Sequence, residues 1–116
     1  MQARTTIIIP NYNGLNFMEP CFEALKKQTV KNYKILVVDN GSTDDSVEWL
    51  KKHEIPSIFL PENTGFTGAV NVGIRAADTP YVLLLNNDTK VEPHFLEALE
   101  RAIGRSEKIF SVSSKV

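Results

Sequence analysis

The sequence predicts an α/β fold, a three-layer sandwich with a mainly parallel, Rossmann-like sheet. Three observations lead to this prediction. Strand-like apolar runs alternate with amphipathic, helix-like stretches along the chain. The run Tyr81 to Leu85 shows no polar alternation, which is typical of a strand covered on both faces. The 116 residues, 42% hydrophobic and 23% charged, fit one globular domain, which we expect to span residues 1–116.

The first two elements are a strand and a helix. Thr5 to Ile9 is a β-branched run ended by Pro10, which predicts a buried strand followed by a loop. Apolar side chains recur at helical spacing from Met18, so an amphipathic helix should follow and end near Gln28. Pro20 is tolerated only if it lies within the first turn of this helix.

The middle of the chain repeats this order. Tyr33 to Val38 predicts a second strand, and residues 39–43 supply a turn and the cap of a second helix. Ser57 to Leu60 predicts a short third strand. Apolar side chains on one face of residues 70–77 predict a third helix.

The last part predicts the centre of the sheet and one more helix. Tyr81 to Leu85 should lie in the middle of the parallel sheet. Pro93 fits the first turn of a fourth helix that reaches Ile103, and Ile109 to Val112 begins a further strand.

Composition excludes several kinds of partner. Lys and Arg number 13 and Asp and Glu number 14, so the net charge of −1 gives no general attraction to nucleic acid. The single cysteine, Cys21, allows no internal disulfide and suits the reducing cytoplasm. His53 and His94 stand in unrelated contexts, which argues against a zinc pair.

Polar residues follow three of the predicted strands, where ligands bind in open sheets of this kind. We expect the loops after Ile9, from Asp39 and from Asn86 to meet there. The Asp39 carboxylate can accept hydrogen bonds from ribose hydroxyls or a base N–H, and it can equally cap the helix that follows. Asn86, Asn87 and Asp88 form an all-oxygen set suited to Mg²⁺ or Mn²⁺ with a diphosphate, or an Asx turn.

Glycines mark a second candidate contact. Gly65 and Gly73 lie near Asn63 and Asn71, so the backbone there can approach phosphate or sugar at a helix N-terminus. Turn formation and tight packing of helix on sheet explain the same glycines.

Four ordered motifs resemble the family 2 glycosyltransferases of GT-A fold. They are Ile7 to Asn13, Val37 to Asp44, Asn63 to Gly65 with Asn71 to Ile74, and Leu84 to Asp88. The resemblance runs from Thr6 to about Leu99. Within the family, the chain looks like the bacterial enzymes that build surface polysaccharide, including rhamnosyltransferase-like members.

The resemblance implies a site for a UDP- or dTDP-linked sugar. Pro10, Asn11 and Tyr12 would lie near the base, and Asp39 would contact uracil or thymine and ribose. Residues 86–88 stand at the family's DXD position, so Asp88 would bind the Mn²⁺ or Mg²⁺ that bridges the diphosphate. The implied chemistry is inverting transfer to a hydroxyl of a saccharide or lipid-linked acceptor.

The sequence departs from the family pattern in two places. Asn86 replaces the first DXD carboxylate, and Val70 replaces a basic residue that contacts phosphate, a contact that Arg75 would otherwise have to supply. The catalytic base remains unknown, because the family carries it and the acceptor part beyond the DXD position.

The length therefore suggests a truncated fragment, with the acceptor part absent and the strand near Ile109 left as an exposed edge. A homodimer through this edge is one expectation. The full-length enzyme would be cytoplasmic, or peripheral at the inner face of the membrane. The alternative is a non-catalytic nucleotide-binding or interaction module that keeps the fold.

Overall fold

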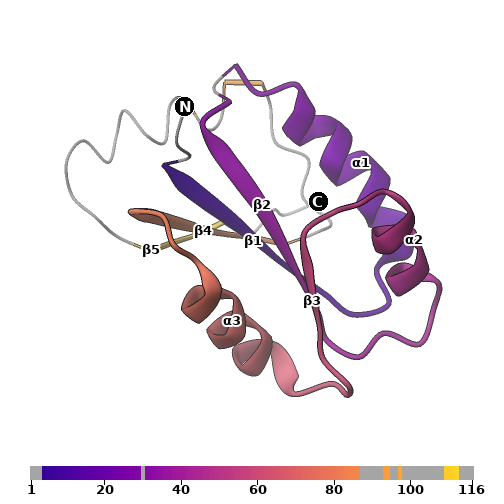
Figure 1. Ribbon diagram of the computed structural model, residues 1–116. Helices are drawn as coiled ribbons and strands as arrows, with labels where there is room; N and C mark the ends of the chain where they lie inside the picture. The colour runs from indigo at the N-terminus through magenta and orange to yellow at the C-terminus, as the bar shows by residue number, and fades with distance from the viewer. Residues whose placement is uncertain (1–3, 30, 87–92, 95–96, 98–108, 113–116) are drawn as a thin grey trace.

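The computed structural model describes residues 4–29, 31–86, 93, 94, 97 and 109–112 (Figure 1). Strands and helices alternate in the described part, as the sequence predicts. In chain order the elements are β1 (Thr5–Asn11), α1 (Leu15–Lys26), β2 (Tyr33–Asp39), α2 (Ser46–Lys52), β3 (Ser57–Phe59), α3 (Gly65–Ala76), β4 (Tyr81–Leu85) and β5 (Ile109–Val112).

The strands form one sheet with the order β3-β2-β1-β4-β5, and each of its four pairings is parallel. The chain builds outward from β1 through β2 to β3 and then returns to the other side of β1 to place β4. The direction of winding thus changes between β1 and β4, where open parallel sheets bind ligands at their carboxyl edge. The predicted α/β sandwich with a parallel sheet is confirmed, and Tyr81–Leu85 does lie inside the sheet.

Helices cover both faces of the sheet (Figure 1). Successive residues of a strand point to opposite faces. Ile7 and Ile9 of β1 therefore pack in the cluster that includes Cys21 of α1 and Leu50 of α2. Ile8 points the other way and packs with Ala69 of α3. Two apolar layers on either side of β1 explain why its isoleucines show no polar alternation.

Glycine lets α3 approach the sheet closely. A Cβ built on Gly73 would lie 2.6 Å from Cγ2 of Ile8 and 3.2 Å from Cγ2 of Val38. Gly65 has φ of +85°, and its Cβ position is open. Of the two explanations predicted for these glycines, tight packing holds for Gly73 and turn formation for Gly65.

Helix α1 begins earlier than the apolar spacing predicts. It starts at Leu15 rather than Met18 and ends at Lys26 rather than near Gln28. Pro20 is therefore the sixth residue of the helix, and the prediction that it lies in the first turn is wrong. The absent N–H of Pro20 leaves the carbonyl of the exposed residue Asn16 without its usual helical partner.

The end of the chain is described only in part. The predicted strand from Ile109 is confirmed as β5, which pairs in parallel with β4 and is the last strand of the described sheet. The predicted helix from Pro93 to Ile103 lies largely outside the described residues. Among the described helices, none has both the length and the apolar character needed to cross a membrane.

Candidate functional site

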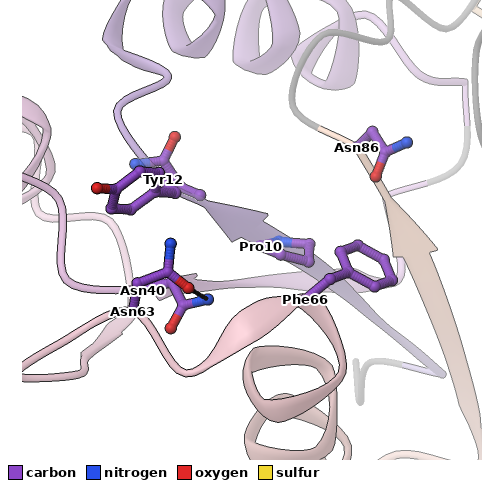
Figure 2. Close-up of a pocket in the computed structure, with 7 residues that line it drawn as sticks. Pro10, Tyr12, Asn40, Asn63, Phe66 and Asn86 are labelled. Atoms are coloured by element: carbon purple, nitrogen blue, oxygen red, sulfur yellow. Dashed lines mark hydrogen bonds between the residues drawn. The ribbon is translucent and has the colours of Figure 1, made fainter.

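A pocket of about 270 Å³ opens at the carboxyl edge of the sheet (Figure 2). It brings together residues from the loops that the sequence predicts to meet there. Figure 2 shows Tyr12, Asn40 and Asn63 on one side, and Pro10 and Phe66 beside each other on the other side, with Asn86 above them. The lining residues are Pro10, Asn11, Tyr12, Asn40, Asn63, Phe66 and Asn86.

At this edge of the sheet, the last residues of β1 and β2 are hydrogen-bonded to each other. Asn11 and Asp39 are partners in the parallel register, so their side chains lie side by side. The Asn11 Nδ2 group donates to Asp39 Oδ1 at 2.9 Å and to Ser42 Oγ at 3.2 Å. Asn11 is buried, and these two bonds set the direction in which its amide faces the pocket.

The buried Asp39 side chain links the end of β1 to the loop after β2. Its side chain is 0% exposed and is not among the lining residues. Besides Asn11, the Ser42 hydroxyl donates to Oδ1 at 2.7 Å and the Ser42 N–H donates to Oδ2 at 3.0 Å. These three bonds make Asp39 an anchor of the β1 and β2 loops. Its contact with base and ribose stays a prediction.

The alternative role predicted for Asp39, capping the next helix, is wrong. Helix α2 begins only at Ser46, seven positions further on, and the Asp39 carboxylate binds the loop at Ser42 instead. The Ser46 N–H donates to Asp44 Oδ1 at 2.9 Å. The loop between β2 and α2 is therefore longer than the sequence predicts, and its residues 42–44 are hydrogen-bonded to Asn11 and Asn13.

Asn13 makes this second tie. Its Oδ1 accepts hydrogen bonds from the N–H groups of Thr43 at 2.7 Å and Asp44 at 3.1 Å, and its own N–H donates to Ser42 Oγ. Asn13 has a φ of +53°, a conformation that asparagine adopts more readily than most residues. Tyr12 therefore lies between two anchored asparagines and is 49% exposed at the pocket.

Asp44 also caps α1 from a distant part of the chain. Its Oδ2 accepts a hydrogen bond from the Leu15 N–H at 3.2 Å. This contact supplies a partner for the first N–H of α1 and explains the early start of the helix. Burial raises the pKa of Asp44, but the hydrogen bonds from Ser46 and Leu15 outweigh it and bring the pKa below its ordinary value of 3.8.

Asp44→Asn should lower the free energy of unfolding at neutral pH by about 0.5 to 1 kcal/mol, as for loss of an exposed helix cap. Because the folded-state pKa is depressed, the stabilisation is present above pH 3.8 and is lost as the pH falls further. Urea unfolding should therefore show the same gap between wild type and variant at pH 7 and pH 5, and a smaller gap at pH 3. Asp45→Asn is the control, since Asp45 makes no side-chain cap bond. Equal gaps for the two variants would contradict the assignment.

Sequence reasoning did not assign Asn40 or Phe66 to the site. Asn40 directly follows Asp39 and is 5% exposed, and its amide reaches the turn before α3. Phe66 is 59% exposed on the first turn of α3. The sequence does contain a signal for Phe66, since it is an aromatic residue that directly follows the turn glycine Gly65. Asn63 belongs to one of the family motifs and neighbours the glycines, but the sequence assigns it no contact of its own, and it lines the pocket.

Two other predicted contacts lie outside this pocket. Asn71 is exposed on α3, and Gly65 borders the pocket without lining it. Arg75 lies in the last turn of α3, nine residues beyond Phe66 and so about 14 Å further along the helix axis. Arg75 does not line this pocket, so its contact with phosphate stays a prediction, and Val70 is buried.

Of the three residues of the predicted metal site, Asn86 is among the residues that the structure describes. Asn86 lines the pocket, whereas Asn87 and Asp88 lie outside the described residues. Within the described part, no group of three or more His, Cys, Asp or Glu side chains gathers as a metal cage would need. The Asn86 amide is compatible with a hard cation, which prefers oxygen ligands, but a cation there needs the Asp88 carboxylate as well. Metal binding by Asp88 stays a prediction.

Comparison with known proteins shows what the chain is similar to. Residues 6–115 match the sequence profile of Glycosyl transferase family 2. Glycosyltransferase GlyA of Streptococcus pneumoniae is 35% identical over 105 residues, which cover 86% of this chain and 15% of GlyA. The teichoic acid poly(glycerol phosphate) polymerase of Staphylococcus epidermidis is 29% identical over 122 residues, 97% of this chain and 17% of the polymerase. The chain thus spans less than a fifth of the length of either relative.

Two solved structures share the fold. S. aureus TarS 1–349, crystallised with UDP-GlcNAc, matches 89% of this chain and 31% of that one, with a TM-score of 0.78 and 24% identity. The mannosyltransferase PcManGT of Pyrobaculum calidifontis, in complex with GDP-Man and Mn²⁺, matches 76% of this chain and 28% of that one, with a TM-score of 0.66 and 25% identity. The predicted GT-A type of α/β fold is confirmed. With the family profile matched from residue 6 to residue 115, the chain belongs to glycosyl transferase family 2.

Proposed function

We propose that this chain is the donor-binding part of an inverting glycosyltransferase. It would bind a UDP- or dTDP-linked sugar, and the complete enzyme would transfer that sugar to an acceptor hydroxyl in surface polysaccharide synthesis, as a member of the rhamnosyltransferase-like subgroup. The observation that carries the proposal is the pocket at the carboxyl edge, where Pro10, Tyr12 and Asn86 meet from β1 and β4. Family membership and the GDP-Man complex of PcManGT support it.

The pocket offers suitable surfaces for a nucleotide. The half-exposed Tyr12 ring provides a face on which a flat base can stack. The amides of Asn11 and Asn63 add polar groups to the lining of the pocket. We place the base near Tyr12 and the diphosphate toward Asn86, because residues 86–88 occupy the family's DXD position.

The residues at the DXD position would hold the divalent cation. Asp88 would supply the carboxylate for Mn²⁺ or Mg²⁺, with Asn86 as a neutral oxygen beside it. When bound, the cation would offset the negative charge of the departing nucleotide diphosphate. The resemblance implies that the general base that activates the saccharide or lipid-linked acceptor lies beyond the DXD position, and we place it there in the complete enzyme. We place that enzyme in the cytoplasm, either free or peripheral at the inner face of the membrane.

Thermal unfolding with nucleotides tests the donor site. We expect UDP or dTDP to raise the melting temperature by several degrees when Mn²⁺ is present, because a ligand at 100 times its Kd stabilises by about 2.7 kcal/mol. GDP and ADP should have smaller effects. Asp88→Asn should remove the Mn²⁺-dependent part of the shift, whereas Asp78→Asn, at an exposed carboxylate after α3, should keep it.

The outcomes separate the two readings of the chain. A shift that depends on both nucleotide and Mn²⁺ supports the donor site. A folded sample that responds to none of the four nucleotides contradicts it and favours the non-catalytic module. A shift that Asp88→Asn leaves intact contradicts the assignment of the metal to Asp88.

A further inference from the structure

The side chain of Asn40 links the end of β2 to the turn before α3. Its Nδ2 group donates to Asn63 Oδ1 at 3.1 Å and to the Gly65 carbonyl at 3.0 Å. Its Oδ1 accepts from the Thr64 N–H at 2.9 Å and from the Thr64 hydroxyl at 3.0 Å. One buried amide thus binds three consecutive residues of a turn that lies 23 to 25 positions away in the sequence.

These four bonds use the full hydrogen-bonding capacity of the Asn40 amide. An asparagine side chain has two N–H protons and two acceptor positions on its oxygen. Asn40 lines the pocket, but its four side-chain hydrogen bonds are all made to the turn and not to a bound molecule. Any effect of Asn40 on binding must therefore pass through the residues that it holds.

Asn63 is the residue through which Asn40 reaches the pocket. Asn63 Oδ1 accepts from Asn40 Nδ2 and from the Gly65 N–H at 2.7 Å. Both of these contacts are made to the oxygen, so the amide is oriented with its Nδ2 group away from the turn. The pocket is thereby given an N–H group in a fixed direction, and Phe66 follows directly after the anchored Gly65.

We propose that Asn40 is a positioning residue for nucleotide binding. It holds the turn 63–65 so that Asn63 presents its N–H group and Phe66 keeps its place across the pocket from Tyr12. The inference rests on the proposed function, because it takes the pocket as the nucleotide site. It requires an amide at position 40, since an aspartate has no N–H protons and would set its negative oxygen against Asn63 Oδ1 and the Gly65 carbonyl.

The test combines three variants with two readouts. Asn40→Ala removes all four contacts to the turn. Asn40→Asp removes the two contacts that Nδ2 donates, keeps an oxygen that can accept from Thr64, and adds a charge. Asn16→Asp adds the same charge on the first turn of α1, at an exposed residue that does not line the pocket. The readouts are the Kd for UDP with Mn²⁺, measured by calorimetry, and the hydrogen exchange rates of the Thr64 and Gly65 amides without nucleotide.

Both Asn40 variants should weaken UDP binding about tenfold. The Thr64 and Gly65 amides should exchange about tenfold faster than in wild type in Asn40→Ala, and the Gly65 amide should do so in Asn40→Asp. Amides in β1 and β4 should keep their rates, which a general loss of stability would not allow. Asn16→Asp should bind as wild type does. If neither Asn40 variant folds, Thr64→Val removes one of the four bonds and should change both readouts in the same direction.

The inference on Asn40 and the proposed function fail in different ways. Wild-type chain that binds neither UDP nor dTDP overturns the proposed function and the positioning role with it. Wild type that binds UDP, together with Asn40 variants of equal affinity, overturns the role of Asn40 alone. Weakened binding with unchanged exchange at Thr64 and Gly65 also overturns it, because the effect would then not pass through the turn.

Discussion

Asp39→Ala is expected to lower the free energy of unfolding by about 3 to 4 kcal/mol. The Asp39 carboxylate is fully buried and accepts hydrogen bonds from Asn11 Nδ2, the Ser42 hydroxyl and the Ser42 N–H. Alanine would leave these groups without their acceptor at a site that water does not reach. Hydrogen bonds to a charged acceptor contribute more than neutral ones, and a buried N–H group without a partner is costly.

Urea unfolding at pH 7 measures this effect, with Glu62→Ala as the control because Glu62 is an exposed carboxylate in the loop after β3. The control should change the free energy of unfolding by less than about 0.5 kcal/mol. Asp39→Asn should fall between alanine and wild type, since its amide keeps one acceptor oxygen but turns N–H groups toward other N–H groups. A loss below about 1 kcal/mol for Asp39→Ala would show that the anchor contributes little.

Asp39 also bears on binding. If the carboxylate serves mainly as an anchor, Ser42→Ala should weaken UDP binding as well, because it removes one of the three contacts that fix the loop beside Asn11. If the carboxylate contacts base and ribose directly, as the family resemblance implies, the Asp39 variants should weaken UDP binding and Ser42→Ala should not. The Kd of Ser42→Ala for UDP thus distinguishes the anchor from the direct contact.

The fold could be predicted from sequence because apolar runs mark buried strands directly. Ile7 to Ile9 and Val82 to Leu85 pack in the apolar clusters on both faces of the sheet, so no polar side chain interrupts these two runs. The start of α1 could not be predicted in this way. It depends on a hydrogen bond from Leu15 to Asp44, which lies 29 residues further on and comes close only when β1 and β2 pair.

The same limit applies to the site. The loops after Ile9 and from Asn86 could be expected at the site because they lie at the carboxyl ends of strands, and the family resemblance adds Pro10 and Tyr12. The role of Asn40 depends on the turn 63–65, which the parallel pairing of β2 with β3 brings beside it. The burial of Asp39 beneath the pocket depends on its register with Asn11. Neither relation is contained in the local sequence of one strand and its loop.

Gly73→Val is the second change with a large expected effect, a loss of about 3 kcal/mol of unfolding free energy. The first added carbon would already lie 2.6 Å from Cγ2 of Ile8 and 3.2 Å from Cγ2 of Val38. Both neighbours are fully buried strand residues, so they have little room to move. The helix must shift away from the sheet, which also displaces its first turn at the pocket. Asn71→Val is the matched control on the exposed face of α3, and it should cost less than about 1 kcal/mol.

A double-mutant cycle shows whether the contact with Ile8 causes this loss. Ile8→Ala removes both Ile8 atoms that crowd position 73, although it is itself destabilising because it leaves a cavity. In that background Gly73→Val should cost at least about 1 kcal/mol less than in wild type, since the valine side chain would occupy part of the cavity. Additive effects of the two changes would mean that the glycine is needed for a reason other than its approach to β1. Coupling would instead establish that the absence of a side chain at position 73 sets the position of α3. The positions of Asn63 and Phe66 follow from that of the helix.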